Sequence, residues 1–352
     1  MNNIELLKKY TLASGISGHE TEVANLLQED LKHADEMSKD RMGSIYSTFK
    51  GSADGPKIMF IAHMDEIGFV VADMTETGLL KIHNVGGWDP NTLLSSPMEV
   101  VTATGERFPG IIGSVPVHFQ TNGNGKPSIM GMFVDVGATS KKDLEENFGI
   151  ALGDPIVPVC NYHYSEKNNR MLSKAFDDRA GVAMLVALGE KLKTVKHPNN
   201  VYLVGSVQEE VGARGAQPIA NYTDADICFV LEGAPADDMP GIPGTPQTAV
   251  GKGAHVRLFD PTLIVRKELR DFVVNTAKKY NIKHQATVRR GGGTDGKVMH
   301  TAAHGIPSIV LGVPVRYAHS HNCLSSVDDF NDVVELITKI CEDFSAEELA
   351  KF

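Results

Sequence analysis

The sequence predicts an α/β fold in which helices flank a mixed central sheet and a small β-rich domain interrupts the chain. Apolar strands alternate with helical stretches outside this insertion, which is typical of helices packed on both faces of a sheet. From about residue 68 to residue 160, glycine-broken segments rich in Val, Thr and Pro take the place of long helical stripes. We therefore expect a discontinuous domain of residues 1–67 and 161–352, with residues 68–160 inserted as a second domain.

The segment before the insertion is expected to contain an amphipathic helix and a buried strand. The helix covers residues 19–33, and its apolar stripe consists of Val23, Leu26, Leu27 and Leu31. The apolar run that begins near Lys57 predicts the strand. Inside the insertion, residues 140–149 have a helical pattern.

The part of the chain after the insertion alternates between helix and strand. The expected elements are, in order, a helix over 177–193, strands over 200–207 and 226–233, a helix over 266–280, strands over 283–288 and 307–315, and a helix over 327–344. Ser326 and Asp329 are placed as a capping pair at the start of the last helix.

The composition limits which binding partners and which cellular compartment we expect. A net charge of −10 leaves no overall positive field for nucleic acid or an anionic membrane. No apolar run reaches the ~20 residues of a membrane helix, and the first residues lack the apolar core of a signal peptide. The four cysteines are scattered, so we expect a reducing, cytoplasmic setting rather than a disulfide framework.

Acidic and histidine side chains stand where the predicted strands end and where one helix begins. Ligands bind beyond the carboxyl ends of the strands in open α/β sheets, so these residues are candidates for one shared site. They come from five segments: His63 and Asp65, Asp177 and Asp178, Glu209 and Glu210, Glu232, and His319 and His321.

Each of these residues has an ordinary explanation when it is considered alone. A lone His after a strand is usually a plain polar residue, Glu232 could be a solvated strand end, and Asp177 or Asp178 could cap a helix. Together, uncompensated acids would repel one another, and two divalent metal ions would remove that repulsion. Carboxylate and imidazole ligands without thiolates suit Zn, Co or Mn.

A two-metal site needs one bridging carboxylate and terminal ligands on both sides. The residues that supply this count are His63, Asp177, Glu210, Glu232 and His319. Spacing alone does not decide between His319 and His321. Glu209 is left as a spare acid, and Asp65, two residues after His63, could accept the His63 N–H.

The stretch "GGGTDGKV" at residues 291–298 resembles a phosphate-binding loop but fails as one. Val298 stands where Ser or Thr must bind magnesium, and Asp295 is an acid in a loop that should hold phosphate. We expect instead a glycine-rich turn near the acidic cluster, with Asp295 capping the next helix.

The chain contains, in order, the motifs "GISGHE" (15–20), "AHMDEIGF" (62–69), "AFDDRAG" (175–181), "EEVGARGA" (209–216), "GGGTDG" (291–296) and "RYAHS" (316–320). Together these six motifs resemble family 42 of the metallopeptidases, the dinuclear aminopeptidases that include glutamyl aminopeptidase and the TET particles. The resemblance implies that the 68–160 insertion is a barrel-like dimerisation domain. It also implies dimers that assemble into a tetrahedral homododecamer.

The resemblance also implies a role for each residue of the cluster. His63 and Glu232 would bind one metal, Glu210 and His319 the other, with Asp177 as the bridge. Glu209 would be the general base and Asp65 would orient His63. Many members have Asp at the position of Glu232, whose longer side chain still offers a carboxylate.

The implied activity is removal of one N-terminal residue from a peptide by a metal-activated water. The resemblance to glutamyl aminopeptidases favours acidic (Glu or Asp) N-terminal residues, which need a local basic pocket. Its candidate residues are Lys252, Arg257, Arg289 and Arg290. The alternatives are a neutral or leucyl preference, a dinuclear deacylase of N-acyl amino acids, and an inactive metal-binding scaffold.

Overall fold

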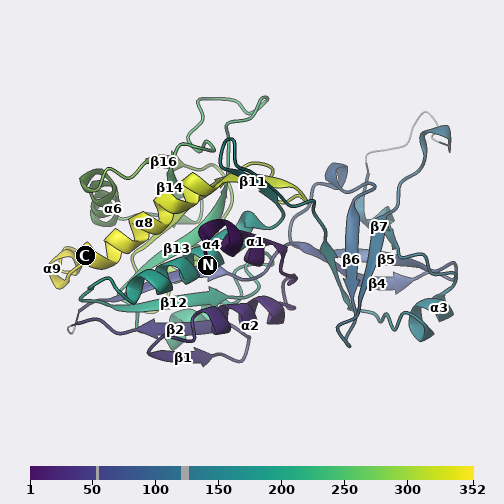
Figure 1. The fold of residues 1–352 in the computed structure, drawn as a ribbon, viewed down its shortest axis with the longest axis horizontal. Helices are drawn as coiled ribbons and strands as arrows, with labels where there is room; N and C mark the ends of the chain where they lie inside the picture. The colour runs from purple at the N-terminus through teal and green to yellow at the C-terminus, as the bar shows by residue number, and fades with distance from the viewer. Residues whose placement is uncertain (53–54, 120–126) are drawn as a thin grey trace.

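The computed structural model describes residues 1–52, 55–119 and 127–352. Residues 53–54 and 120–126 lie outside the described residues, and the second gap falls within the predicted insertion. The described chain forms an α/β body with a closed barrel beside it (Figure 1). The predicted fold class is confirmed.

The α/β body is built on a mixed sheet that contains nine strands among the described residues. In spatial order these are β1 (Glu36–Lys39), β2 (Ile45–Phe49), β12 (Asn200–Ser206), β3 (Lys57–His63), β13 (Ile227–Pro235), β17 (Ser308–Val315), β14 (Ala254–Asp260) and β15 (Leu263–Ile264), with β16 (His284–Val288) pairing to β14. The four central strands, β12, β3, β13 and β17, run parallel, and the outer pairings β2–β12 and β14–β17 are antiparallel. The carboxyl ends of the four parallel strands therefore lie along one edge.

Helices cover both faces of the sheet, as the alternation along β3 requires. Ile58, Phe60 and Ala62 belong to one buried core, whereas Met59 and Ile61 belong to the other, because neighbouring strand residues point to opposite faces. The larger core includes residues of α1 (Asn3–Leu12), α2 (Thr21–Asp30), α4 (Phe176–Leu192), α6 (Lys267–Lys279) and α8 (Val327–Asp343). The smaller core includes residues of α5 (Ala216–Tyr222) and α7 (Gly296–Met299).

The barrel consists of six strands in the part of the chain that the structure describes. Their order around the barrel is β4 (Gly68–Met74), β5 (Leu79–Val85), β8 (Phe133–Asp135), β7 (Arg107–Ile112), β6 (Pro97–Val101) and β9 (Pro155–Pro158). Its own core includes Phe69, Leu80, Val100 and Ile156, and the helix α3 (Lys141–Glu146) packs there through Leu144. All six strands fall between residues 68 and 160.

A small antiparallel sheet and several short helices complete the described fold. The sheet contains β10 (His163–Ser165), β11 (Arg170–Ser173) and β18 (Cys323–Ser326), and it joins the chain after the barrel to the segment before α8. The short helices are η1 (Pro90–Thr92), η2 (Val117–Phe119), η3 (Ile129–Gly131) and α9 (Ala346–Leu349). Within the described ranges, no helix combines the length and apolar character that crossing a membrane would take.

The capping pair expected at the start of α8 is only partly met. The Ser326 side chain caps α8 by accepting the N–H of Asp329, but the Asp329 carboxylate does not complete the pair. It accepts instead the N–H groups of Gly251 and Gly253, at 2.6 and 2.7 Å. Two converging amides satisfy a buried carboxylate better than the single amide of a capping box.

Candidate metal centre

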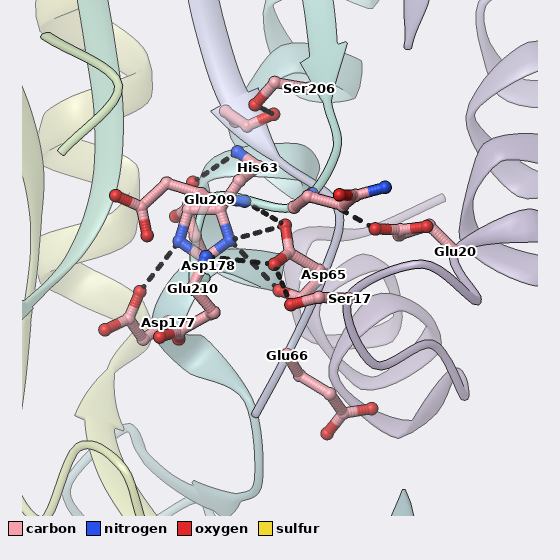
Figure 2. Close-up of polar contacts among 12 residues, drawn as sticks. Ser17, Glu20, His63, Asp65, Glu66, Asp177, Asp178, Ser206, Glu209 and Glu210 are labelled. Carbon is pink, nitrogen blue, oxygen red and sulfur yellow. Dashed lines mark hydrogen bonds and ion pairs between the residues drawn. The ribbon is translucent and has the colours of Figure 1, made fainter. Parts of the chain in front are cut away.

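The sheet itself brings the candidate residues to one edge. His63 is the last residue of β3, and the register pairs it with Ser206 at the end of β12, just before Glu209 and Glu210. Glu232 lies in β13, and His319 follows β17. Because these parallel strands end together, residues far apart in the sequence meet within one small region. Figure 2 shows this for His63, Glu209 and Glu210.

Asp177 reaches the same region because the start of α4 packs closely against β13. A Cβ atom at Gly233 would lie 2.4 Å from the Phe176 carbonyl oxygen, so only glycine permits this approach. The capping role expected for one of the two acids falls to Asp178, whose carboxylate accepts the N–H of Gly181 at 2.9 Å. Asp178 also accepts the N–H of His63 at 3.1 Å, which ties the helix start to the end of β3.

The two oxygens of the Asp177 carboxylate face different histidines. Oδ1 lies 3.2 Å from Nε2 of His63, and Oδ2 lies 3.5 Å from Nε2 of His319. This is the arrangement that a bridging carboxylate between two ions needs.

Glu232 and Glu210 complete the two halves of the cluster. Oε2 of Glu232 lies 3.8 Å from Nε2 of His63, and Oε1 of Glu210 lies 3.6 Å from Nε2 of His319. Among the described residues, two groups of ligand atoms are close enough to hold an ion: one from His63, Asp178 and Glu232, and one from His63, Asp177 and Glu210. The first group includes Asp178, which the sequence placed in the cluster without a ligand role.

Asp65 contacts His63 and also the two glutamates of the cluster, Glu209 and Glu210. Nδ1 of His63 lies 3.0 Å from the main-chain oxygen of Asp65 and 3.5 Å from its carboxylate, so the hydrogen bond is to the backbone. The carboxylate, which is fully buried, accepts the N–H of Glu209 at 3.0 Å and of Glu210 at 3.1 Å. It therefore fixes the turn that carries the two glutamates.

Burial and the crowding of like charges change the pKa values of the acids in the cluster. Burial, together with repulsion by Asp295 and Glu210, raises the pKa of Glu209 to about 8. Burial and repulsion by Asp177 raise the pKa of Glu210 to about 7. Burial acts on Asp177 in the same direction, but hydrogen bonds from His319 and His63 hold the pKa of Asp177 below its ordinary value. The acids outnumber the two imidazoles, so cations bound among them would relieve the repulsion.

The donor set fits divalent metal ions. It combines imidazole nitrogens with carboxylate oxygens at mutual distances of 3.2–3.8 Å, and these donor types suit Zn, Co and Mn.

Two contacts near the cluster were not predicted from the sequence. The main-chain oxygen of Gly87, in the loop after barrel strand β5, lies 2.8 Å from Nδ1 of His319. Asp295 occupies the residue before α7, but the expectation that its side chain caps this helix is wrong. Its carboxylate turns inward and accepts the Ser206 hydroxyl at 2.5 Å, while Oδ1 is buried without a partner among the described residues.

A cavity of ≈ 220 Å³ opens onto the cluster. Its lining includes His63, Asp177, Glu209, Glu210, Glu232, His319, Arg257, Arg289 and the glycine-rich turn 291–294. The other two cationic candidates, Lys252 and Arg290, have exposed side chains and do not belong to the lining that the structure describes. The turn 291–294 thus serves as a wall of the cavity.

Comparison with known proteins gives one consistent family. The family model described as M42 glutamyl aminopeptidase matches residues 43–336. A glutamyl aminopeptidase of Lactococcus lactis subsp. cremoris is 31% identical over 99% of this chain and 98% of its own. A lysyl aminopeptidase of Pyrococcus furiosus is 32% identical, with 96% of each chain covered.

Two solved structures of aminopeptidases or peptidases of the TET type are also similar to this chain. The TET aminopeptidase of a Thaumarchaeota archaeon superposes with a TM-score of 0.95 at 36% identity, covering 99% of this chain and 98% of that one. The TET1 peptidase of Pyrococcus horikoshii, which can assemble into a tetrahedron or a large octahedral shell, gives 0.85 at 29% identity, covering 97% and 100%.

Proposed function

The chain belongs to the M42 glutamyl aminopeptidase family of metallopeptidases, and on this premise we propose that it removes acidic N-terminal residues from peptides at a two-metal centre. The observation that carries the proposal is the Asp177 carboxylate, whose two oxygens face His63 and His319 separately. His63 and Glu232 are assigned to one ion, Glu210 and His319 to the other, and Asp177 to both. Zn or Co, and also Mn, fit these donors.

When bound, the two ions would supply Lewis acidity that polarises the scissile carbonyl and makes water a usable nucleophile. Glu209 is the general base: it takes a proton from the attacking water and returns it to the leaving amine. Burial and the neighbouring acids raise the pKa of the Glu209 carboxyl, which makes its carboxylate a stronger proton acceptor than that of an ordinary glutamate. Asp65 holds Glu209 in place through the main-chain N–H.

The wall of the cavity supports a preference for acidic residues. Arg257 and Arg289 both line it, and an arginine fork pairs well with a carboxylate. Arg257 is buried and lies 3.3 Å from Asp260, so part of its charge is already compensated. Nη1 of Arg289 donates to the Pro235 carbonyl, a neutral acceptor, which leaves Arg289 as the stronger candidate for a substrate carboxylate. The cavity of ≈ 220 Å³ is smaller than the ~300–1,000 Å³ of pockets for drug-sized ligands, which fits a single amino-acid side chain.

The relatives differ in the residue that they remove, since one is named for glutamyl and one for lysyl substrates. A panel of glutamyl, aspartyl, lysyl and leucyl nitroanilides, with an N-acetyl-glutamyl control, tests the proposal on protein loaded separately with Zn, Co and Mn. We expect the acidic substrates to have the highest kcat/KM and the N-acetylated one to resist cleavage. Faster leucyl or lysyl cleavage would overturn the acidic preference, cleavage of the acetylated substrate would favour a deacylase, and metal binding without turnover would indicate a scaffold.

We also propose that dimers form through the barrel and assemble into a tetrahedral homododecamer that works in the cytoplasm. The support is the assembly recorded for the TET1 peptidase of Pyrococcus horikoshii and the four free cysteines of this chain. Sedimentation at micromolar concentration tests the assembly, and a stable monomer would contradict it.

A further inference from the structure

The N-terminal segment Gly15–Glu20 lies directly against the candidate metal centre. Glu66 donates its N–H to the Gly15 carbonyl at 3.0 Å, and Ile16 forms a parallel bridge with Glu66. This pairing places the segment beside the turn that follows His63. Two of its polar side chains, Ser17 and Glu20, point toward the turn that carries Glu209 and Glu210 (Figure 2).

The Ser17 hydroxyl acts through Asp65. It donates to Oδ2 of Asp65 at 2.6 Å, and the same carboxylate accepts the N–H groups of Glu209 and Glu210. These three donors fix the rotation of a carboxylate that is fully buried. If Ser17 is removed, Asp65 loses a donor on the oxygen that also holds Glu210, and the turn is held less firmly.

Glu20 acts through the residue before Glu209. Its Oε1 accepts the N–H of Gln208 at 3.1 Å and the N–H of Gly18 at 2.8 Å. Gln208 has a φ of +56°, a conformation that a residue other than glycine keeps only when its surroundings hold it there. The Glu20 side chain is buried, with 6% of the residue exposed, so its contacts are not shared with bulk water.

We infer that Ser17 and Glu20 are positioning residues for the general base. From outside the cluster they hold the backbone of the turn after β12, and so they fix the position of Glu209. This inference rests on the proposed function, because it assigns a purpose to the position of Glu209. Neither residue lines the cavity as the structure describes it, so their effect on substrate binding should be small.

The test compares variants that lose each contact with variants that keep it. Ser17→Ala removes the hydroxyl, and Ser17→Thr retains one. Glu20→Met removes the acceptor at similar size, and Glu20→Gln retains an oxygen. The controls are substitutions of two exposed residues: Ser38→Ala on β1 and Glu29→Gln on α2. For each variant, kcat and KM on the best panel substrate, bound metal and the melting temperature are measured.

We expect Ser17→Ala and Glu20→Met each to lower kcat about tenfold, which is about 1.4 kcal/mol, with KM and bound metal within about twofold of wild type. Ser17→Thr and Glu20→Gln should recover most of the lost kcat, and the two controls should match wild type. A role in folding alone would lower the melting temperature or the metal content together with activity, and that result would overturn the inference.

Wild-type kcat in folded, metal-loaded Ser17→Ala and Glu20→Met would also overturn it. Glu209→Gln, measured beside them, separates this failure from failure of the proposed function. If Glu209→Gln is inactive while the other two are fully active, only the positioning inference falls. If Glu209→Gln itself keeps wild-type turnover, the base assignment falls.

Discussion

The main-chain oxygen of Gly87 lies 2.8 Å from Nδ1 of His319, so the loop after barrel strand β5 contacts a candidate ligand on the α/β body. The neighbouring Trp88 ring lies 5.3 Å from the ring of His321 and 5.3 Å from that of Phe69, between body and barrel. His319 has a φ of +60°, and these contacts hold its loop in place. A carbonyl on the far nitrogen of a metal-binding histidine fixes the ring and its tautomer.

Replacing Trp88 with leucine should therefore weaken metal binding without emptying the barrel core. We expect the dissociation constant of the more weakly held ion to rise about tenfold, as is usual when the support of a ligand is lost. Competition with a chromogenic chelator measures it. Leu94→Ala, at an exposed position in the barrel segment, is the control. Unchanged affinity in Trp88→Leu would show that the barrel does not support His319.

The basic wall should determine the choice of N-terminal residue. Arg289→Met is expected to lower kcat/KM for a glutamyl substrate at least tenfold while leaving a leucyl substrate within about threefold, because a charge-assisted hydrogen bond is lost. Arg257→Met should act in the same direction but disturb packing with Asp260 as well. The exposed Arg290→Met and Lys252→Met serve as matched controls. Equal losses on both substrates would remove Arg289 from the specificity pocket.

The loop that carries His319 starts from an ion pair whose strength depends on pH. Nε and Nη2 of Arg316 donate to the two oxygens of Asp238 at 2.8 and 2.6 Å. The hydrogen bond from Arg316 holds the pKa of Asp238 below its ordinary value of 3.8. A lowered carboxyl pKa gives stability that is complete above the unfolded value and is lost as the pH falls through the folded value.

Asp238→Asn should thus lower the free energy of unfolding by about 1 kcal/mol near pH 7, a modest figure because the Arg316 side chain is 33% exposed. The difference in melting temperature between wild type and variant should shrink as the pH falls below about 4. Thermal melts of metal-free protein across this range measure it, with Glu347→Gln as an exposed control. A difference that stays constant with pH would contradict the account.

Much of the fold and of the candidate site follows from the sequence for a simple physical reason. His63, Glu209, Glu210 and Glu232 stand at or near the carboxyl ends of apolar strands, and parallel strands place these ends along one edge. The break in helical periodicity near residue 68 likewise coincides with the first barrel strand.

The other features of the site depend on backbone geometry that no local sequence pattern encodes. Which of two adjacent acids caps α4 is decided by the turn at the helix start, where Asp178 reaches Gly181 and Asp177 does not. The inward turn of Asp295 follows from a partner on β12, 89 residues away in sequence. The contact of Gly87 with His319 spans 232 residues and uses a main-chain oxygen, which every residue has. The glutamate assignments themselves stay predictions.

The most direct test of the account compares Glu209→Gln with Glu210→Gln in the same assays. Metal content by mass spectrometry and kcat on the best panel substrate are measured for both proteins. Glu209→Gln is expected to keep two ions per chain and lose about 10²–10⁴-fold in kcat, since general acid–base catalysis contributes that much. Glu210→Gln is expected to lose metal, with activity partly restored by excess ion. Wild-type turnover in Glu209→Gln, or full metal content in Glu210→Gln, would contradict the central claim that these adjacent carboxylates have separate roles.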